Sequence, residues 1–431
     1  MKKIATLITM LTVAAAAAGK DIDLGATGVR ADGVTKVTER IQKAIDAVSR
    51  SGGGRVILSG GTFLSGSLQL KDGVELHIAA GATLLASPDI ADFPMREIRH
   101  CNGPETFPRW SNKCFILADG AENIAITGQG RIDCNGDKHV REKTAPDWAG
   151  LRFERILPVE QTLPRVVFLA ACRNVTVTDI TMVGQPGGWT FWVSGCEDVT
   201  FDHCNILANV EYPNNDGIHI NSSANVKVTN CNIETGDDCI VVRGLNRTLR
   251  KGRACENVTV SDCTLCSSCA CIRIAYVGDG IVRNCSFSNL TMRNSFNGVM
   301  IELPVRGPKN DYGVEETLVE NLSFSNITMS GISNFPVEIF IADDPTTPVK
   351  AIRDLVFSNI RSTSYRLPSL IGTPACHLQN IVFNGCSFTR IPYEESGCQW
   401  RRLTEKQKKN TTGLRMEHCD GVKFNNTEFK I

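Results

Sequence analysis

The sequence has no surplus of charge of either sign. Lysine and arginine together number 46, aspartate and glutamate also number 46, and the formal net charge is zero. Proteins that bind nucleic acid or anionic membranes usually carry a basic patch or stripe, which this balance does not predict. We therefore expect no nucleic-acid partner.

The chain of 431 residues also lacks a Pro/Ser-rich linker or a block of like charges that would divide it. This length exceeds what one ordinary core supports, although 42% apolar and 21% charged residues are typical of a folded chain. A stack in which each unit contacts only its neighbours resolves the conflict. We expect a single domain over residues 20–431, in which residues 20–100 form the N-terminal cap and first coils.

A membrane span is also missing. The apolar run of residues 4–18 follows Lys2 and Lys3 and ends in small residues, and it is too short to cross a bilayer. This pattern is typical of a secretory signal peptide. We expect residues 1–19 to be removed and the mature protein to be exported, to the periplasm or the extracellular space.

The cysteine-rich segments lack the partners of a zinc site. Cys266, Cys269 and Cys271 are closely spaced, but no histidine lies in the same stretch and no second pair has zinc-ribbon spacing. We therefore predict no metal and no other cofactor. Eighteen cysteines in an exported protein would suggest disulfides, yet five occupy equivalent places in a repeat and should point inward as small apolar residues. These five are Cys204, Cys231, Cys263, Cys285 and Cys386.

Short units of alternating polar and apolar residues recur along the chain. Taking Val175, Val199, Val226 and Val258 as equivalent gives spacings of 24, 27 and 32 residues, too irregular for ankyrin or tetratricopeptide repeats. The alternation is typical of strands, and one strand cannot bury its apolar face alone. Stacked coils do bury it, so we predict an all-β fold built as a parallel β-helix solenoid.

One helix is expected near the N-terminus. Apolar residues spaced i, i+3, i+4 and i+7 from Ile41 predict an amphipathic helix over Thr38 to Arg50, ended by Gly52-Gly53-Gly54. Such a helix would cover the open end of the solenoid. Strands are expected after it at residues 55–58, 62–64 and 74–78.

Two acidic groups stand about one coil apart, namely Asn214-Asn215-Asp216 and Gly236-Asp237-Asp238, with 21 residues between Asp216 and Asp237. Inverting hydrolysis of a glycosidic bond needs two carboxyl groups roughly 6.5–9.5 Å apart. Neighbouring strands about 4.8 Å apart, with splayed side chains, can provide that gap. Crowding should raise the pKa of one carboxyl, which then serves as the acid. The alternative is that both groups are turns, which Asn, Asp and Gly favour.

These acidic groups belong to a set of motifs that resembles glycoside hydrolase family 28, the polygalacturonases and rhamnogalacturonases. The other motifs are Asp32-Gly33-Val34-Thr35, Gly52-Gly53-Gly54-Arg55-Val56, Gly61-Thr62-Phe63 and Gly128-Gln129-Gly130-Arg131-Ile132-Asp133. The resemblance spans almost the whole mature chain. It implies a right-handed β-helix with an open groove that hydrolyses α-linked pectic polysaccharide with inversion. It also implies that Asp237 donates the proton, while Asp216 and Asp238 hold and deprotonate the water.

The sequence departs from this family pattern at two places. Polygalacturonases carry Gly-His-Gly on the next coil, where this chain has Cys269-Ala270-Cys271, so no histidine is available there. They also carry Arg-Ile-Lys to grip the galacturonate carboxylate, whereas this chain has Met300-Ile301-Glu302. A glutamate would repel a uronate, which favours a relative with another pectic substrate, such as a rhamnogalacturonan or a side-chain sugar.

Other side chains are candidates for substrate binding. Strand alternation places His219 and Arg273 on the outward face near the acids. Arg243 ends the strand after Asp238, and Arg306 lies just beyond Glu302; either arginine could bind a carboxylate bidentately. For each of these five residues, a solvated surface group is the alternative. Two tryptophans, 189 and 192, would either stack on sugar rings or belong to the core.

Two further classes of function remain open. A pectic lyase on the same fold would abstract a ring proton with a basic residue and commonly use Ca²⁺. A non-catalytic glycan-binding β-helix would bind polysaccharide unchanged. We expect the partner to be a pectic polysaccharide or oligosaccharide, and the protein to be a monomer.

Overall fold

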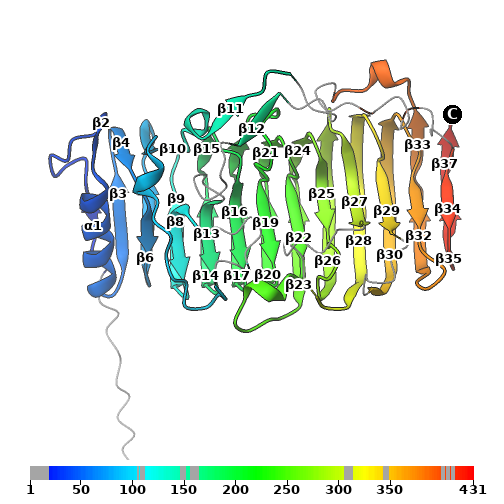
Figure 1. Ribbon diagram of the computed structural model, residues 1–431, viewed down its shortest axis with the longest axis horizontal. Coiled ribbons are helices and arrows are strands. Elements are labelled where there is room, and N and C mark those ends of the chain that lie inside the picture. Colours follow the sequence, from blue (N-terminus) through cyan, green and yellow to red (C-terminus); the bar gives the residue numbers. More distant parts are fainter. Residues whose placement is uncertain are drawn as a thin grey trace, which may run out of the picture.

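The strands stack coil on coil into an elongated parallel β-helix, with helix α1 (Thr38–Arg50) at one end and the C-terminus at the other (Figure 1). This computed structural model describes residues 19–103, 106, 112–145, 152–155, 165–304, 314–342, 349–398, 403, 408 and 413–431. The predicted all-β, right-handed parallel β-helix with a capping helix is confirmed. The expected leader lies outside the described residues, apart from Gly19. In the described part of the chain, no helix combines the length and apolar character needed to cross a membrane.

Two parallel sheets form the described coils. The smaller sheet carries the acidic motifs at its strand starts and contains β5 (Leu68–Leu70), β8 (Cys114–Asp119), β13 (Arg165–Ala170), β16 (Trp189–Ser194), β19 (Ile218–Asn221), β22 (Ile240–Arg243), β25 (Ala270–Ile274), β27 (Asn297–Leu303), β29 (Val337–Ile341), β31 (Ser369–Ile371) and β34 (Arg415–Glu417).

The larger sheet contains β1 (Ile22–Asp23), β2 (Asp32–Lys36), β3 (Gly54–Leu58), β4 (Gly61–Ser65), β6 (Val74–Ile78), β7 (Ala82–Ala86), β9 (Glu122–Thr127), β10 (Arg131–Asp133), β14 (Arg173–Thr178), β15 (Thr181–Val183), β17 (Glu197–Asp202), β18 (Asn205–Leu207), β20 (Ala224–Thr229), β21 (Asn232–Thr235), β23 (Cys255–Ser261), β24 (Thr264–Ser267), β26 (Ile281–Arg293), β28 (Thr317–Ile332), β30 (Val349–Ser364), β32 (Leu378–Asn384), β33 (Ser387–Arg390), β35 (Cys419–Asp420), β36 (Lys423–Asn425) and β37 (Glu428–Lys430). A separate antiparallel hairpin pairs β11 (Val140–Glu142) with β12 (Phe153–Arg155).

The four valines taken as equivalent in the sequence are paired in register. Val175 pairs with Val199, Val199 with Val226, and Val226 with Val258. The unequal spacing arises in the connections to and from the smaller sheet, because the longest spacing includes the segment between β22 and β23. The repeat inferred from the sequence is therefore the structural coil.

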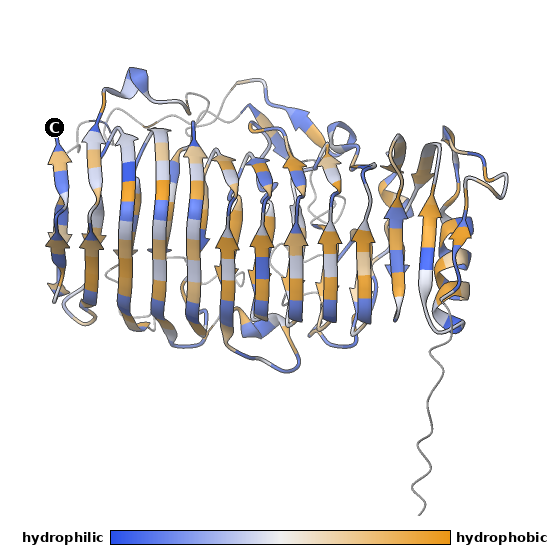
Figure 2. Cartoon of the chain, turned by 180° about the vertical axis from the view of Figure 1, so that it is seen from behind, coloured by the Kyte–Doolittle hydropathy of each residue, from blue (hydrophilic) through white to orange (hydrophobic). Residues whose placement is uncertain are grey.

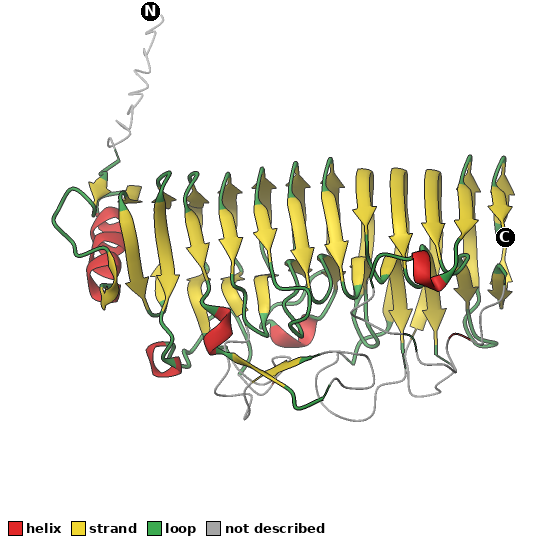
Figure 3. Cartoon of the chain, turned by 90° about the horizontal axis from the view of Figure 1, so that it is seen from above, coloured by secondary structure: helices red, strands yellow, loops and turns green. Residues whose placement is uncertain are grey.

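Alternating side chains build one continuous core. Figure 2 shows apolar and polar residues alternating along the strands. Helix α1 buries Ile41, Ala44, Ile45 and Val48, the four residues that predicted it, and contacts β3, β5 and β6 at the end of the stack (Figure 3). The five repeat cysteines are free and lie in this core, as predicted.

Phenylalanines of successive coils stack face to face inside the C-terminal half. The Phe287, Phe324 and Phe357 rings follow one another with centroids 4.9 and 4.7 Å apart, and Phe383 continues the column at 4.7 Å. Aromatic pairs in offset stacks contribute about 0.5–1.5 kcal/mol beyond the burial of their area. The column therefore fixes the side-chain register between coils as well as burying apolar surface.

Left-handed backbone conformations mark two corners of each coil. At the first corner φ lies between 50° and 57° in nine residues, namely Asn123, Asn174, Asp198, Asn225, Asn257, Asn284, Asn321, Asp354 and Asn380. Asn and Asp adopt this conformation more readily than other non-glycine residues, which explains why each repeat unit begins with one of them. Their side chains also bond from coil to coil, as in Asn257 Nδ2 to Asn225 Oδ1 at 3.0 Å. The second corner is one or two residues long. Asn289 and Asn326 occupy it on neighbouring coils with φ of 54° and 55°, and Asn326 Nδ2 donates to Asn289 Oδ1 at 3.2 Å.

Candidate active site

The two acidic motifs lie side by side, one coil apart. Ile218 pairs with Ile240, so Asp216 and Asp238, each two residues earlier, occupy equivalent places on neighbouring coils. The Gly217 amide donates to the Asp238 carbonyl over 2.9 Å, which ties the two segments together. The Asp216 and Asp238 side chains are both buried, with 4% and 2% of the residue exposed.

Asp237 is partly exposed, and its backbone is fixed by two hydroxyl groups. The Oγ1 atom of Thr235 and the Oγ atom of Ser267 each donate to the Asp237 carbonyl at 2.6 Å. Asn214 Nδ2 donates to the Asp237 carboxylate at 3.1 Å. The asparagine of the first motif thus orients the acid of the second, a role that the turn interpretation of Asn214 does not require.

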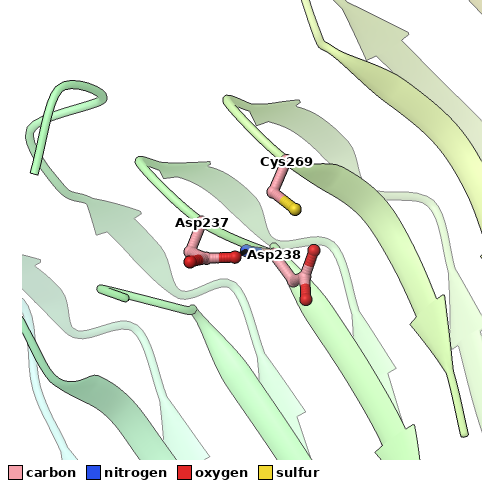
Figure 4. Close-up of side chains that lie close together, drawn as sticks. All are labelled: Asp237, Asp238 and Cys269. Carbon is pink, nitrogen blue, oxygen red and sulfur yellow. Dashed lines mark hydrogen bonds between the residues drawn. The ribbon is translucent and has the colours of Figure 1, made fainter. Parts of the chain in front are cut away.

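Cys269 lies beside the acids from the following coil (Figure 4). Its Sγ atom and carboxylate oxygens of Asp237 and Asp238 all lie within 4.8 Å of one another. Among the described residues this is the group best arranged to hold a cation. Calcium prefers six to eight oxygen ligands, so two carboxylates and a thiol match it poorly.

His219 faces outward from the core as predicted, but it is buried, with Trp189 packed on its ring and Trp192 beside it on the neighbouring strand. Its ring centroid lies 4.0 Å from that of Trp189 and 4.8 Å from that of Trp192. Its Nδ1 atom is 3.4 Å from Asp216 Oδ2. A histidine therefore does reach the acids, from the coil of the first motif and not from the Gly-His-Gly position.

The pKa of His219 lies well below its usual value. Burial is the main cause, and the positive charges of Arg243, Arg165 and Arg273 act in the same direction. The imidazole is therefore neutral at neutral pH and contacts Asp216 without forming a charged pair. The Trp189 and Trp192 rings are 4.7 Å apart, and Trp192 is completely buried. Trp192 therefore packs inside the protein and has no exposed face on which a sugar ring could stack.

Arg243 is held by an internal partner. Its Nε and Nη2 atoms donate to the two Asp279 carboxylate oxygens at 3.0 and 2.7 Å, and both side chains are almost completely buried. The guanidinium also lies 4.5 Å from the centroid of the Tyr276 ring. Arg243 thus makes with Asp279 the two hydrogen bonds that the sequence led us to expect with a substrate carboxylate. Asp279 was not predicted from the sequence.

Arg273 and Glu302 contact each other. Arg273 Nη2 donates to Glu302 Oε2 at 3.1 Å, and its guanidinium lies 4.1 Å from the centroid of the Tyr276 ring. Burial would lower the pKa of Arg273, but Tyr276 and the carboxylates of Asp238 and Glu302 raise it above its usual value. Arg273 is therefore a charged group between Asp238 and Glu302. Arg306, the fifth candidate, lies outside the described residues.

Glu338 continues this column of outward-facing residues and was not predicted from the sequence. Arg273 pairs with Met300, and Met300 pairs with Glu338 on the next coil. Burial raises the pKa of Glu338 to about 8, and the negative charge of Glu302 acts in the same direction. The alternating sequence Val337-Glu338-Ile339 predicts that Glu338 points outward, but nothing in it indicates that this side chain is half-buried beside Glu302.

The raised pKa of Glu338 predicts a pH-dependent effect of Glu338→Gln on stability. Between the usual carboxyl pKa and about 8, the folded state keeps a proton that the unfolded state releases, so stability falls as pH rises. Glutamine cannot ionise. The variant should be more stable than the parent by about 1–2 kcal/mol near pH 7, and equal to it near pH 4, because the side chain keeps some solvent access.

Urea denaturation at both pH values would test this prediction. The exposed Glu316→Gln provides a control with no difference between the two conditions. Equal stability of Glu338→Gln and the parent near pH 7 would contradict the raised pKa.

The hairpin β11–β12 stands beside the acid-bearing coils (Figure 1). Its Phe153 ring packs against Tyr212 with centroids 4.8 Å apart, and the Tyr212 hydroxyl donates to Asp137 at 2.8 Å. Tyr212 belongs to the segment that leads to Asp216. The hairpin therefore positions the approach to the first acidic motif.

Carboxylates of neighbouring coils, gathered at one edge of a parallel β-helix, define a polysaccharide-processing β-helix protein. The model of the glycosyl hydrolases family 28 matches residues 103–400. The chain belongs to this family and is a glycosidase that acts on O-glycosyl bonds. The family resemblance inferred from the sequence is confirmed.

Known proteins agree with this assignment. An endo-polygalacturonase of Pectobacterium carotovorum is 27% identical over 302 residues, which cover 64% of this chain and 74% of that protein. The solved exopolygalacturonase of Thermotoga maritima has a TM-score of 0.67 at 20% identity and covers 95% of this chain and 92% of its own. That of Yersinia enterocolitica has a TM-score of 0.69 at 20% identity, covering 95% and 78%. The two structures support the fold.

Proposed function

We propose that the protein is an inverting hydrolase of α-glycosidic bonds in pectic polysaccharide. The observation that carries this proposal is the equivalent placement of Asp216 and Asp238 on neighbouring coils, with Asp237 next to Asp238 in the chain and partly exposed. The chain belongs to the glycosyl hydrolases family 28, and one of its relatives is an endo-polygalacturonase.

In this proposal Asp237 is the general acid, because it is the most exposed of the three carboxyl groups and can reach a leaving oxygen. Asp216 and Asp238 hold and deprotonate the attacking water. Coils about 4.8 Å apart with splayed side chains can provide the separation that inversion requires. Neutral His219 beside Asp216 places no positive charge on that carboxyl group, so the two do not form an ion pair that a base would first have to break.

A rhamnogalacturonan or a side-chain sugar is the second candidate substrate. Arg273 forms an ion pair with Glu302, and Arg243 forms one with Asp279. Both of these candidate arginines therefore already have a carboxylate partner within the protein. A uronate bound by Arg273 would lie next to the Glu302 carboxylate, which repels it. We infer that the sugar next to the scissile bond on this side is neutral.

Incubation with a panel of pectic fractions tests the proposed function. A hydrolase releases reducing ends from homogalacturonan, rhamnogalacturonan or a branched fraction, is unaffected by chelator, and gives a product of inverted anomeric configuration by NMR. A lyase would instead give ultraviolet-absorbing products and lose activity with chelator. Binding without any new ends would identify a glycan-binding protein and overturn the proposal.

A further inference from the structure

A hollow lies at the ends of the smaller-sheet strands opposite to the acidic residues. It has a volume of about 570 Å³ and is lined by the turns after β13 and β16, by strand starts of the larger sheet, and by the segment from Leu249 to Arg253. The acids precede their strands, whereas this hollow follows β13 and β16. Six residues of β16 at about 3.3 Å each place the two sites about 20 Å apart.

The hollow carries a surplus of positive charge. Its lining contains five arginines and lysines, namely Arg99, Arg173, Arg250, Lys251 and Arg253, against three glutamates, Glu122, Glu197 and Glu256. The protein as a whole has no net charge. The lining of this hollow is therefore more basic than the protein as a whole, which the overall net charge of zero does not reveal.

Two of the three glutamates are already engaged. Glu197 is shared by Arg173 at 3.9 Å and Arg253 at 3.5 Å, and Glu256 pairs with Arg283, outside the hollow, at 2.8 Å. Lys251 forms no ion pair with any residue that the structure describes. Arg173 has 62% of its side chain exposed. Arg99 and Arg250 pair with carboxylates outside the lining, Asp119 at 3.4 Å and Glu97 at 3.8 Å. Lys251 and the exposed part of Arg173 therefore remain accessible to an anionic ligand.

The segment that supplies these cations is held in place. Asn102 Nδ2 donates to the Leu249 carbonyl at 2.9 Å, the Arg250 amide donates to the His100 carbonyl at 3.1 Å, and Arg250 Nε donates to the Cys101 carbonyl at 3.1 Å. Binding a ligand here does not require this segment to be ordered first. A preorganised site loses less conformational entropy on binding.

We infer that this basic hollow is a second binding site for acidic polysaccharide, which holds uronate carboxylates of a chain away from the point of cleavage. The inference rests on the proposed function, since it assumes a pectic substrate. Its volume falls in the range of ligand sites, and several cations suit a polymer that carries uronate carboxylates along its length. A second contact on one polymer raises its effective concentration at the first.

The test compares two double charge reversals in an Asp237→Asn background, which stops turnover. Lys251→Glu with Arg173→Glu alters the hollow, and Lys227→Glu with Lys350→Glu makes the same change of net charge at exposed positions elsewhere. The probe is polygalacturonate, titrated calorimetrically at low and high salt. The hollow variant should bind about 10-fold more weakly at low salt, and the control within about twofold of the parent.

Lys251→Ala with Arg173→Ala keeps the inference testable if charge reversal disturbs folding, and it should weaken binding about threefold. Neutral galactan should bind equally to all variants. Equal polygalacturonate affinity of the hollow and control variants would overturn the inference. Because the readout is binding, failure to cleave any pectic fraction would overturn the proposed function and leave this result unaffected.

Discussion

Replacing Asp237 with asparagine is expected to abolish hydrolysis while the protein stays folded. Asparagine cannot donate a proton to the leaving oxygen, and loss of a general acid or base typically costs about 10²- to 10⁴-fold in rate. Asp216→Asn should have an effect of the same order, because it removes one of the two carboxylates proposed to hold and deprotonate the water. Reducing-end release from the best pectic substrate, measured at saturation, would give the loss in kcat.

A matched control separates chemistry from folding. Asp262→Asn makes the same change at an exposed corner, where φ is 58° and Asn289 Nδ2 donates to Asp262 Oδ1 at 3.2 Å. Asparagine tolerates this conformation and can accept the same hydrogen bond, so activity should be unchanged. Asp216→Asn and Asp237→Asn should alter unfolding free energy by no more than about 1–2 kcal/mol. Large destabilisation of either variant would support the interpretation of both motifs as turns.

Arg243→Ala is expected to lower the free energy of unfolding by about 3–5 kcal/mol, because it leaves the buried carboxylate of Asp279 without its ion-pair partner. The exposed pair of Arg353 and Glu320, at 2.7 Å, provides the comparison. Arg353→Ala should cost less than about 1 kcal/mol, since solvent screens exposed charges. Urea denaturation of both variants would measure the difference.

The same experiment decides between two roles of Arg243. If Arg243→Ala kept its stability but lost affinity for substrate, the arginine would be a substrate-binding residue, as the sequence suggested. Replacing both partners, with Arg243→Met and Asp279→Leu, should recover part of the lost stability, because no buried charge remains.

The periodicity of the sequence predicted most of the fold. Alternation around Val175 and its equivalents predicted the strands and their register, and the spacing from Ile41 predicted helix α1 with its observed bounds. The adjacency of Asp216 and Asp238 followed from the same period. These features depend on contacts within a coil or between neighbouring coils, which a repeat makes visible.

What covers the outward face was not visible in the sequence. Alternation correctly placed His219 and Arg273 outside the core, but both are buried: Trp189 of the preceding coil packs on His219, and Tyr276, just beyond the end of strand β25, packs on Arg273. The pairing of Arg243 with Asp279 joins residues one coil apart, and Asp279 lies in the irregular segment between β25 and β26, whose path no local pattern specifies. Glu338 was missed for the same reason, because its burial depends on its neighbours and not on its strand.

The two asparagine-rich corners have a consequence for how this fold can diversify. The second corner keeps its short length from coil to coil, whereas the segments entering and leaving the smaller sheet vary widely, as the stretch between β22 and β23 illustrates. Insertions at those ends leave the rung spacing untouched. A lineage can therefore exchange the segments that meet its polymer, or acquire new ones, while the distance between carboxylates on adjacent rungs is inherited unchanged.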